Sequence, residues 1–160
     1  MVDKARLLQG AITQVEETLR RLSSEHAVAK QATLESPHVM KSKREVTGIE
    51  ASYLANALAG NIQERQVWLR MLRQLQLPEA PQRASLGCVV GIGRAQGLVE
   101  HLYFILPACG GMEIPLGGRI RTVRVVTPET PVAKALIGKS VGDEVELQKG
   151  QGAQSVLAIF

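Results

Sequence analysis

A heptad seam in the first third of the chain most constrains what it can fold into. Between residues 3 and about 34, apolar or small side chains recur at alternating spacings of four and three residues. This is the spacing of a coiled-coil helix, whose single apolar stripe needs a partner helix to be buried. The seam is formed by Leu8, Ile12, Val15, Leu19, Leu22, His26 and Ala29. We therefore predict one long amphipathic helix that pairs with another.

A second apolar face lies within residues 46 to 77, where Arg65 interrupts it. Its members are Ile49, Leu54, Leu58, Ile62, Leu69 and Leu72, with Trp68 and Leu75 beside them. Pro37 disfavours helix in the turn before it and predicts a reversal of the chain. The two segments are thus predicted to form an antiparallel coiled-coil hairpin with its tip at about 35–45. Two arms of a parallel dimer, or a three-helix bundle lacking its third helix, remain as alternatives.

Glycine usage separates the chain into two parts. Three of the 15 glycines precede residue 84, and the stretch from Leu77 to Arg83 contains two prolines among polar residues. These features predict a hairpin domain at 1–77, a linker at 78–84 and a second domain at 85–160. Hydrophobic residues make up 45% of the chain and aromatic residues only 3%. The core must therefore be aliphatic, and an aromatic stacking platform for single-stranded nucleic acid is disfavoured.

The second domain has the pattern of a β-rich fold. Apolar runs predict strands at 85–92, 98–106, 120–126 and 155–160, and alternation predicts a further strand that includes Val145 and Leu147. The glycine- and proline-rich stretch 107–118 is expected to be a long loop. Several antiparallel strands with one short helix predict an α+β domain.

Local chemistry specifies the region from Val125 to Leu147 in most detail. Thr130 can cap a helix, and Pro131 suits the first helical position because no N–H is needed there. Val132, Ala135, Leu136 and Ile137 would give the helix an apolar face. Gly138 is expected to end the helix with a positive φ. A strand, a short helix, a turn and a strand are therefore predicted in that order.

The same region resembles the C-terminal signature of the Gre factors, bacterial proteins that act on RNA polymerase. The matching positions are Thr130, Pro131, Ala133, Lys134, Ala135, Leu136, Gly138, Lys139, Gly142, Asp143 and Val145. Residues 47–60 more weakly resemble a short Gre-like subgroup. The resemblance implies an FKBP-like C-terminal domain that docks on RNA polymerase. For docking we select Thr130, Pro131 and Leu136, although Leu136 could instead pack in the core.

In Gre factors the coiled coil enters the polymerase secondary channel, and acidic residues at its tip help a Mg²⁺ ion of the polymerase to hydrolyse backtracked RNA. Each arm here, at about 32 residues, would be roughly 48 Å long. The resemblance makes Glu45 the candidate tip acid, and Glu35 on the other arm could supply a second carboxylate for a shared Mg²⁺.

The tip also departs from the family, because basic residues surround Glu45. Lys41, Lys43 and Arg44 could contact the phosphates of the nascent RNA 3′ end or acidic walls of the channel. Stimulation of transcript cleavage and regulation without cleavage therefore both stay open.

The sequence lacks the motifs expected of a self-contained enzyme. His26, His38 and His101 share no metal-ligand spacing, and the sequence contains neither a nucleophile elbow nor a P-loop. We expect an accessory factor with no cofactor and no bound metal in isolation. A peptidyl-prolyl isomerase is disfavoured because the β-rich part offers only three large aromatic rings, those of Tyr103, Phe104 and Phe160.

Charge and cysteine content set the expected surroundings. The net charge of +4 permits a nucleic-acid neighbour without requiring one. Cys88 and Cys109 lack redox or metal spacing and are expected to be buried in a reducing cytoplasm. No apolar run is long enough to predict a membrane span.

We expect a monomer that binds RNA polymerase. The alternative is a coiled-coil interaction module with no polymerase link, since the seam could also pair two chains.

Overall fold

The computed structural model describes residues 2–34, 41–94, 97–116, 120, 122–147 and 152–160, with the side chains of residues 33, 34 and 41–47 outside that description. Two long helices, α1 (Lys4–Leu34) and α2 (Lys41–Gln74), precede a sheet domain that carries one short helix. The predicted α+β class is confirmed. The chain divides into two compact units: Thr13–Arg70, here called the hairpin unit, and Met1–Ile12 with Met71–Phe160, here called the globular unit. The domain boundaries predicted at 77 and 85 stay a prediction.

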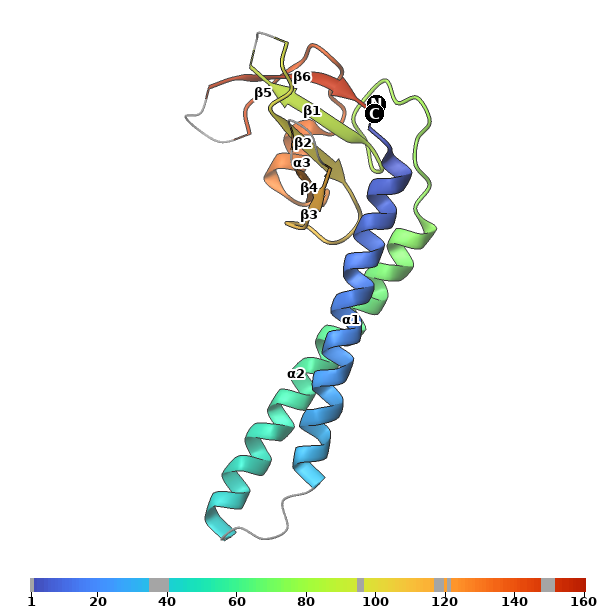
Figure 1. Cartoon of the computed structure of the whole chain (residues 1–160). Helices are drawn as coiled ribbons and strands as arrows, with labels where there is room; N and C mark the ends of the chain where they lie inside the picture. Colours follow the sequence, from blue (N-terminus) through green and yellow to red (C-terminus); the bar gives the residue numbers. More distant parts are fainter. Residues whose placement is uncertain (1, 35–40, 95–96, 117–119, 121, 148–151) are drawn as a thin grey trace. The chain divides into compact units, whose positions relative to one another are not determined.

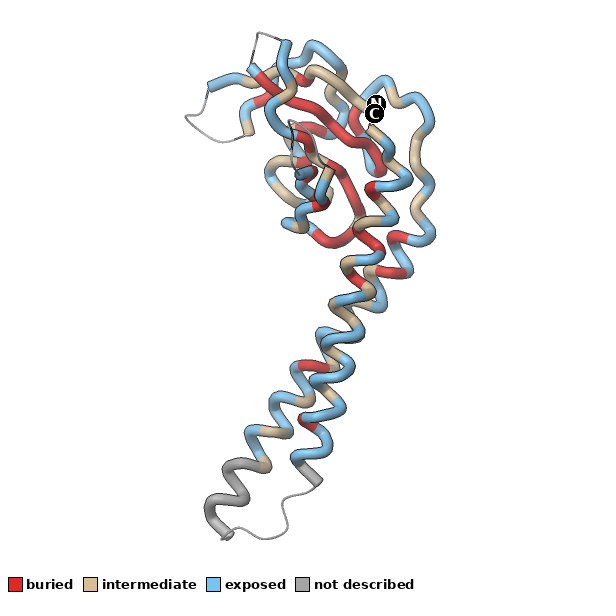
Figure 2. The backbone as a smooth tube through the Cα atoms, in the orientation of Figure 1, coloured by how far each residue is buried: buried red, intermediate tan, exposed pale blue. Residues whose placement is uncertain are grey.

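Within the hairpin unit the two helices run antiparallel beside each other (Figure 1). Val15 and Ala29 of α1 are buried, as are Leu58 and Leu69 of α2. The other seam positions of α1 in this unit, Leu19, Leu22 and His26, are half-buried. The residues of the seam are therefore buried to different extents, as the interrupted red colour along the two helices in Figure 2 shows.

Two expectations for α2 were wrong. The helix begins at Lys41, inside the stretch of about 35–45 that was expected to form the tip. Ile49 and Leu54, placed on the apolar face by their spacing, are more than half exposed. Arg65, which interrupts the apolar face, stacks its guanidinium 3.9 Å from the centre of the Trp68 ring and pairs with Glu64. The cation–π contact lets a charged residue cover the apolar face of Trp68.

The globular unit contains a six-stranded sheet in the order β3-β4-β2-β1-β6-β5. The strands are β1 (Val89–Gly93), β2 (His101–Ile105), β3 (Glu113–Pro115), β4 (Thr122–Val126), β5 (Glu144–Val145) and β6 (Gln154–Ile159). β2 and β4 pair in parallel, whereas the other neighbours pair antiparallel. The all-antiparallel expectation was therefore wrong, because the segment between β2 and β4 crosses over and adds β3 at the edge. β3 lies inside the stretch 107–118 that was expected to be a loop.

Helices pack against the sheet at two places. On one face the short helix α3 (Pro131–Leu136) contributes Ala133 and Leu136 to a core cluster with residues of β1, β2, β4, β5 and β6. On β3, Ile114 comes close to α1, since a Cβ placed on Gly10 would lie 3.2 Å from its Cγ2 atom. Aliphatic side chains make up nearly all of this core, as the composition predicted, and Phe104 is the one large aromatic side chain among its largest fully buried residues.

Candidate functional site

The segment that begins α3 is held in place by its own hydrogen bonds. Thr130 is extended, and its hydroxyl accepts a hydrogen bond from the Ala133 N–H at 3.3 Å while donating one to the Thr127 carbonyl at 2.7 Å. Pro131 occupies the first helical position, where its missing N–H costs nothing. Gly138 follows the helix with a φ of +84°. The predicted cap, first turn and stop are thus all present.

The other end of α3 is tied to the stretch before β1. The Gly138 N–H donates to the Ala84 carbonyl at 2.8 Å, and the Ala84 N–H donates to the Lys139 carbonyl at 2.8 Å. Ala84 is itself buried. A pair of backbone hydrogen bonds therefore fixes α3 at its C-terminal end, and the turn at Thr130 fixes it at its N-terminal end. A surface presented by α3 would be rigid.

The three residues selected for docking lie in different environments. Pro131 is exposed and Thr130 is half-buried, so both can be reached from solvent. Leu136 is fully buried in the core cluster, which agrees with the packing explanation for this residue. Ile137, expected on the apolar face, is 41% exposed because the helix ends before it. With Val141, 59% exposed, it adds an apolar side chain to the surface that follows α3.

A small pocket of about 100 Å³ opens on the sheet face beside the start of α3. The parallel pairing of β2 with β4 sets Tyr103 next to Arg124, and His101 lies two residues before Tyr103 with the ring centres 6.5 Å apart. The lining residues are His101, Tyr103, Arg124, Val126, Val132, Leu147 and Gln154. Four polar side chains therefore share a concave surface with three aliphatic ones. We call it the sheet-face pocket.

Arg124 is the charged group of the sheet-face pocket. Its guanidinium Nη2 donates to Glu113 Oε1 at 3.0 Å across the β3–β4 pair. The hydrogen bond and the charge of Glu113 raise the pKa of Arg124 above its ordinary value. The guanidinium is cationic throughout the physiological pH range, as an arginine side chain ordinarily is. The side chain is 59% exposed, so this ion pair contributes little to stability.

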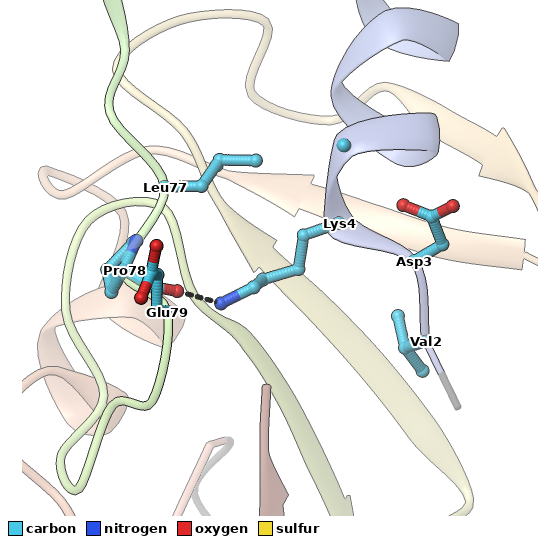
Figure 3. A pocket seen from close by; sticks show the side chains of 7 residues that line it. Val2, Asp3, Lys4, Leu77, Pro78 and Glu79 are labelled. Atoms are coloured by element: carbon cyan, nitrogen blue, oxygen red, sulfur yellow. Dashed lines mark hydrogen bonds between the residues drawn. The ribbon is translucent and has the colours of Figure 1, made fainter.

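A groove of about 470 Å³ lies at the start of α1, between its first turn and the stretch after α2 (Figure 3). The Lys4 ammonium donates to the Pro78 carbonyl. Asp3 caps α1 by accepting a hydrogen bond from the Arg6 N–H at 3.0 Å. Leu77 supplies apolar surface. These contacts tie α1 to the predicted linker, and we interpret them as structural.

A second groove, of about 550 Å³, lies between the arms of the hairpin unit. Val28 and Leu54, which are among its lining residues, are 66% and 54% exposed. Tyr53, in the stretch that resembles the short Gre-like subgroup, is 73% exposed. This part of the hairpin unit therefore leaves large apolar side chains exposed, although Ala29 and Leu58 on the same groove are buried.

The predicted tip residues cannot be placed as a site. The backbone of Lys41, Lys43, Arg44 and Glu45 belongs to the first turns of α2, while their side chains and all of Glu35 lie outside the described residues. The approach of the two carboxylates thus stays a prediction. Elsewhere in the described chain, no group of three or more histidine, cysteine or acidic residues could hold a metal ion.

Neither cysteine forms a disulfide, and both are buried, as predicted. The Cys88 thiol lies 3.3 Å from the Ser85 hydroxyl in the turn before β1. Among the helices of the described residues, none is both long and apolar enough to cross a membrane.

Comparison with solved structures finds similarity to Gfh1, a homologue of the factor GreA. The Gfh1 proteins of Thermus thermophilus and Thermus aquaticus are each 21% identical to this chain, with TM-scores of 0.34 and 0.35. The first alignment covers 93% of this chain and 94% of the relative, and the second covers 94% of both. A further structure of the transcription factor Gfh1 is 21% identical with a TM-score of 0.38, covering 98% of this chain and 92% of that one. No family model and no curated protein sequence matches the chain.

Sequence reasoning missed the sheet-face pocket entirely. Its residues come from five places in the chain, namely β2, β4, α3, the residue Leu147 after β5, and β6. Their approach depends on the strand order and on the parallel register of Tyr103 with Arg124. The one signal for this pocket in the sequence was the presence of a polar residue, His101 or Arg124, within a mostly apolar strand. Without the register, that signal could not be distinguished from an ordinary solvent-facing position.

Proposed function

We propose that the chain is a Gre-like transcription factor that binds bacterial RNA polymerase and modulates elongation. The segment from Thr130 to Gly138 carries the proposal. Its sequence resembles the Gre signature, and it forms a rigid capped helix with Pro131 exposed at its start. Exposed proline beside a fixed turn offers a contact surface that needs little ordering on binding. Ile137 and Val141 would extend that surface.

In this proposal the hairpin enters the secondary channel of the polymerase. Glu45, with Glu35 as a second carboxylate, would help to hold a Mg²⁺ ion shared with the polymerase active site. Lys41, Lys43 and Arg44 would contact RNA phosphates or acidic channel walls. The protein is then an accessory factor, and any RNA cleavage is performed by the polymerase. Carboxylate oxygens are suitable ligands for Mg²⁺ and can orient its water.

Retention on immobilised core RNA polymerase tests the proposal. The full chain should be retained at low salt, and Pro131→Asp should weaken retention because it places a charge on the docking surface. Pro115→Asp, on the exposed edge strand β3, is the matched control and should bind like the wild type. Absence of retention of the wild-type chain would remove the polymerase proposal.

A stalled, backtracked elongation complex distinguishes the two modes of action. If the tip assists metal chemistry, the wild-type chain should release short 3′ RNA fragments and Glu45→Ala should not. Altered elongation without fragments would instead identify a regulator that does not stimulate cleavage. Glu50→Ala, on an exposed position of α2 beyond the tip, is a suitable control for the loss of one carboxylate.

A second candidate function is a coiled-coil interaction module that does not bind polymerase. The exposure of Val28, Tyr53 and Leu54 on the hairpin unit favours it, because large exposed apolar groups often mark protein contacts. Sedimentation of the isolated chain separates the candidates. A concentration-dependent dimer that Tyr53→Ser and Leu54→Ser together abolish would support this module, whereas a monomer at all concentrations would count against self-association.

A further inference from the structure

The size of the sheet-face pocket limits what it can hold. Its volume is about 100 Å³. Cofactor and drug-sized ligand sites are commonly ~300–1,000 Å³, and an engineered cavity of about 150 Å³ holds one benzene molecule. The pocket therefore has room for a group smaller than a benzene ring, such as the end of one side chain.

The lining chemistry selects among such groups. Arg124, Tyr103, His101 and Gln154 can each donate hydrogen bonds, and no acidic residue belongs to the lining. Glu113 binds the Nη2 of Arg124 from the neighbouring strand β3, while a guanidinium carries five N–H donors in all. Donors outnumber acceptors, and one donor carries a full positive charge. A carboxylate is the small group that uses this combination best, since hydrogen bonds between ionised partners are stronger than neutral ones.

The aliphatic part of the lining completes the match. Val126, Val132 and Leu147 form the apolar side of the pocket, with Val126 in the core cluster and the other two packed against it. An inorganic anion would gain nothing from these side chains. A carboxylate on a short methylene stem would place its stem against them and its oxygens among the donors. Aspartate and glutamate side chains have this form.

The position of the pocket indicates where that carboxylate would come from. Val132 lines the pocket and directly follows Pro131, which is exposed at the start of the segment Thr130 to Gly138 that is proposed to dock. A protein that contacts Pro131 would then lie one residue along the chain from the pocket lining, within reach of a side chain. We propose that the sheet-face pocket receives an aspartate or glutamate side chain of the protein that docks on α3. The identity of that protein as RNA polymerase rests on the proposed function, whereas the carboxylate site does not.

Nuclear magnetic resonance of the full chain tests the site with glutarate, which carries a carboxylate on a short methylene stem. Saturable shifts are expected for amides and methyl groups of Val126, Val132 and Leu147. Glutaramide, the neutral isostere, should leave them unchanged. Arg124→Gln should weaken glutarate binding about tenfold, as loss of one hydrogen bond to a charged group does.

Three results of that titration would overturn the site. These are glutarate shifts that fail to saturate, equal shifts with glutaramide, and unchanged binding in Arg124→Gln with a preserved amide spectrum. Arg94→Gln removes an exposed arginine just after β1 that is outside the lining, and it serves as the control for net charge.

The polymerase assay then separates the two proposals. If polymerase supplies the carboxylate, Arg124→Glu should reduce retention about tenfold or more, while Arg94→Glu should not. Retention that survives Arg124→Glu, together with an absent glutarate site, overturns the pocket and leaves docking through Pro131 intact. A saturable glutarate site in a chain that polymerase does not retain supports the pocket and removes the polymerase proposal.

Discussion

The hairpin unit and the globular unit both contain many aliphatic residues but bury them very differently. Of the 12 largest side chains that are fully buried among the described residues, only Val15 belongs to the hairpin unit. The same unit exposes Val28, Ile49, Tyr53, Leu54 and Val67. Free energy from burial is thus concentrated in the globular unit. The hairpin unit should open locally at a lower free energy, as regions with few buried apolar contacts do.

Leu136→Ala should have the largest effect on this contrast. The side chain is fully buried between α3 and the sheet, so its truncation removes apolar burial and leaves a cavity. We expect a loss of about 2–5 kcal/mol in the free energy of unfolding, measured by denaturant unfolding with a probe in the globular unit. Ile137→Ala, one residue further and 41% exposed, should cost far less. Similar losses for both would contradict the placement of Leu136 in the core.

Leu58→Ala should produce a smaller effect that is confined to the hairpin unit. Leu58 is buried against the other arm but lines an open groove, so we expect a cost near the lower limit for leucine truncation, about 2 kcal/mol. Hydrogen exchange of the amides in the middle of α1 and α2 should accelerate while the amides of β1 and β2 keep their rates. Leu54→Ala, at an exposed site on the same groove, is the control. Equal acceleration in the sheet would mean that the two units unfold together.

The same contrast explains how much of the structure could be predicted from the sequence. The turn at Thr130, the start at Pro131 and the stop at Gly138 depend on neighbouring residues, and all were predicted. The hairpin arms follow from periodicity, although spacing alone could not tell that Leu54 would be exposed.

The rest of the candidate site depends on pairings distant in sequence. Neither the parallel register of Tyr103 with Arg124 nor the short strand β3, which ends at Pro115, has a local signal. The capped helix from Thr130 to Gly138 was therefore accessible to sequence reasoning, and the pocket beside it was not.

Thr130→Val tests the local part of the site with an effect of intermediate size. Valine keeps the shape of threonine but loses the hydroxyl that bonds both the Ala133 N–H and the Thr127 carbonyl. The expected cost is about 1–2 kcal/mol. Thr130→Ser keeps the hydroxyl and should restore most of the stability. If serine and valine behaved alike, the packing of the methyl group, and not the cap, would hold the turn.

Two glycines in the long helices allow a direct comparison of the two units, with the smallest expected changes in stability. Glycine costs a helix interior about 0.5–1 kcal/mol relative to alanine. In the hairpin unit a Cβ on Gly60 of α2 would meet nothing within 4 Å, so Gly60→Ala should recover most of this amount. In the globular unit a Cβ on Gly10 of α1 would lie only 3.2 Å from Ile114 Cγ2. Gly10→Ala must displace that side chain, and we expect the crowding to offset the gain in helix propensity.

Thermal unfolding followed by circular dichroism, with hydrogen exchange to assign each change to a unit, measures both substitutions. Gly60→Ala should slow exchange in the hairpin unit, and Gly10→Ala should give no gain in the globular unit. The double substitution Gly10→Ala with Ile114→Ala removes the crowded Cγ2 atom and should recover the missing stabilisation relative to Ile114→Ala alone. An equal gain in stability from both single substitutions would show that α1 and β3 are packed no more tightly than the arms of the hairpin. The two units would then differ only in which residues they bury.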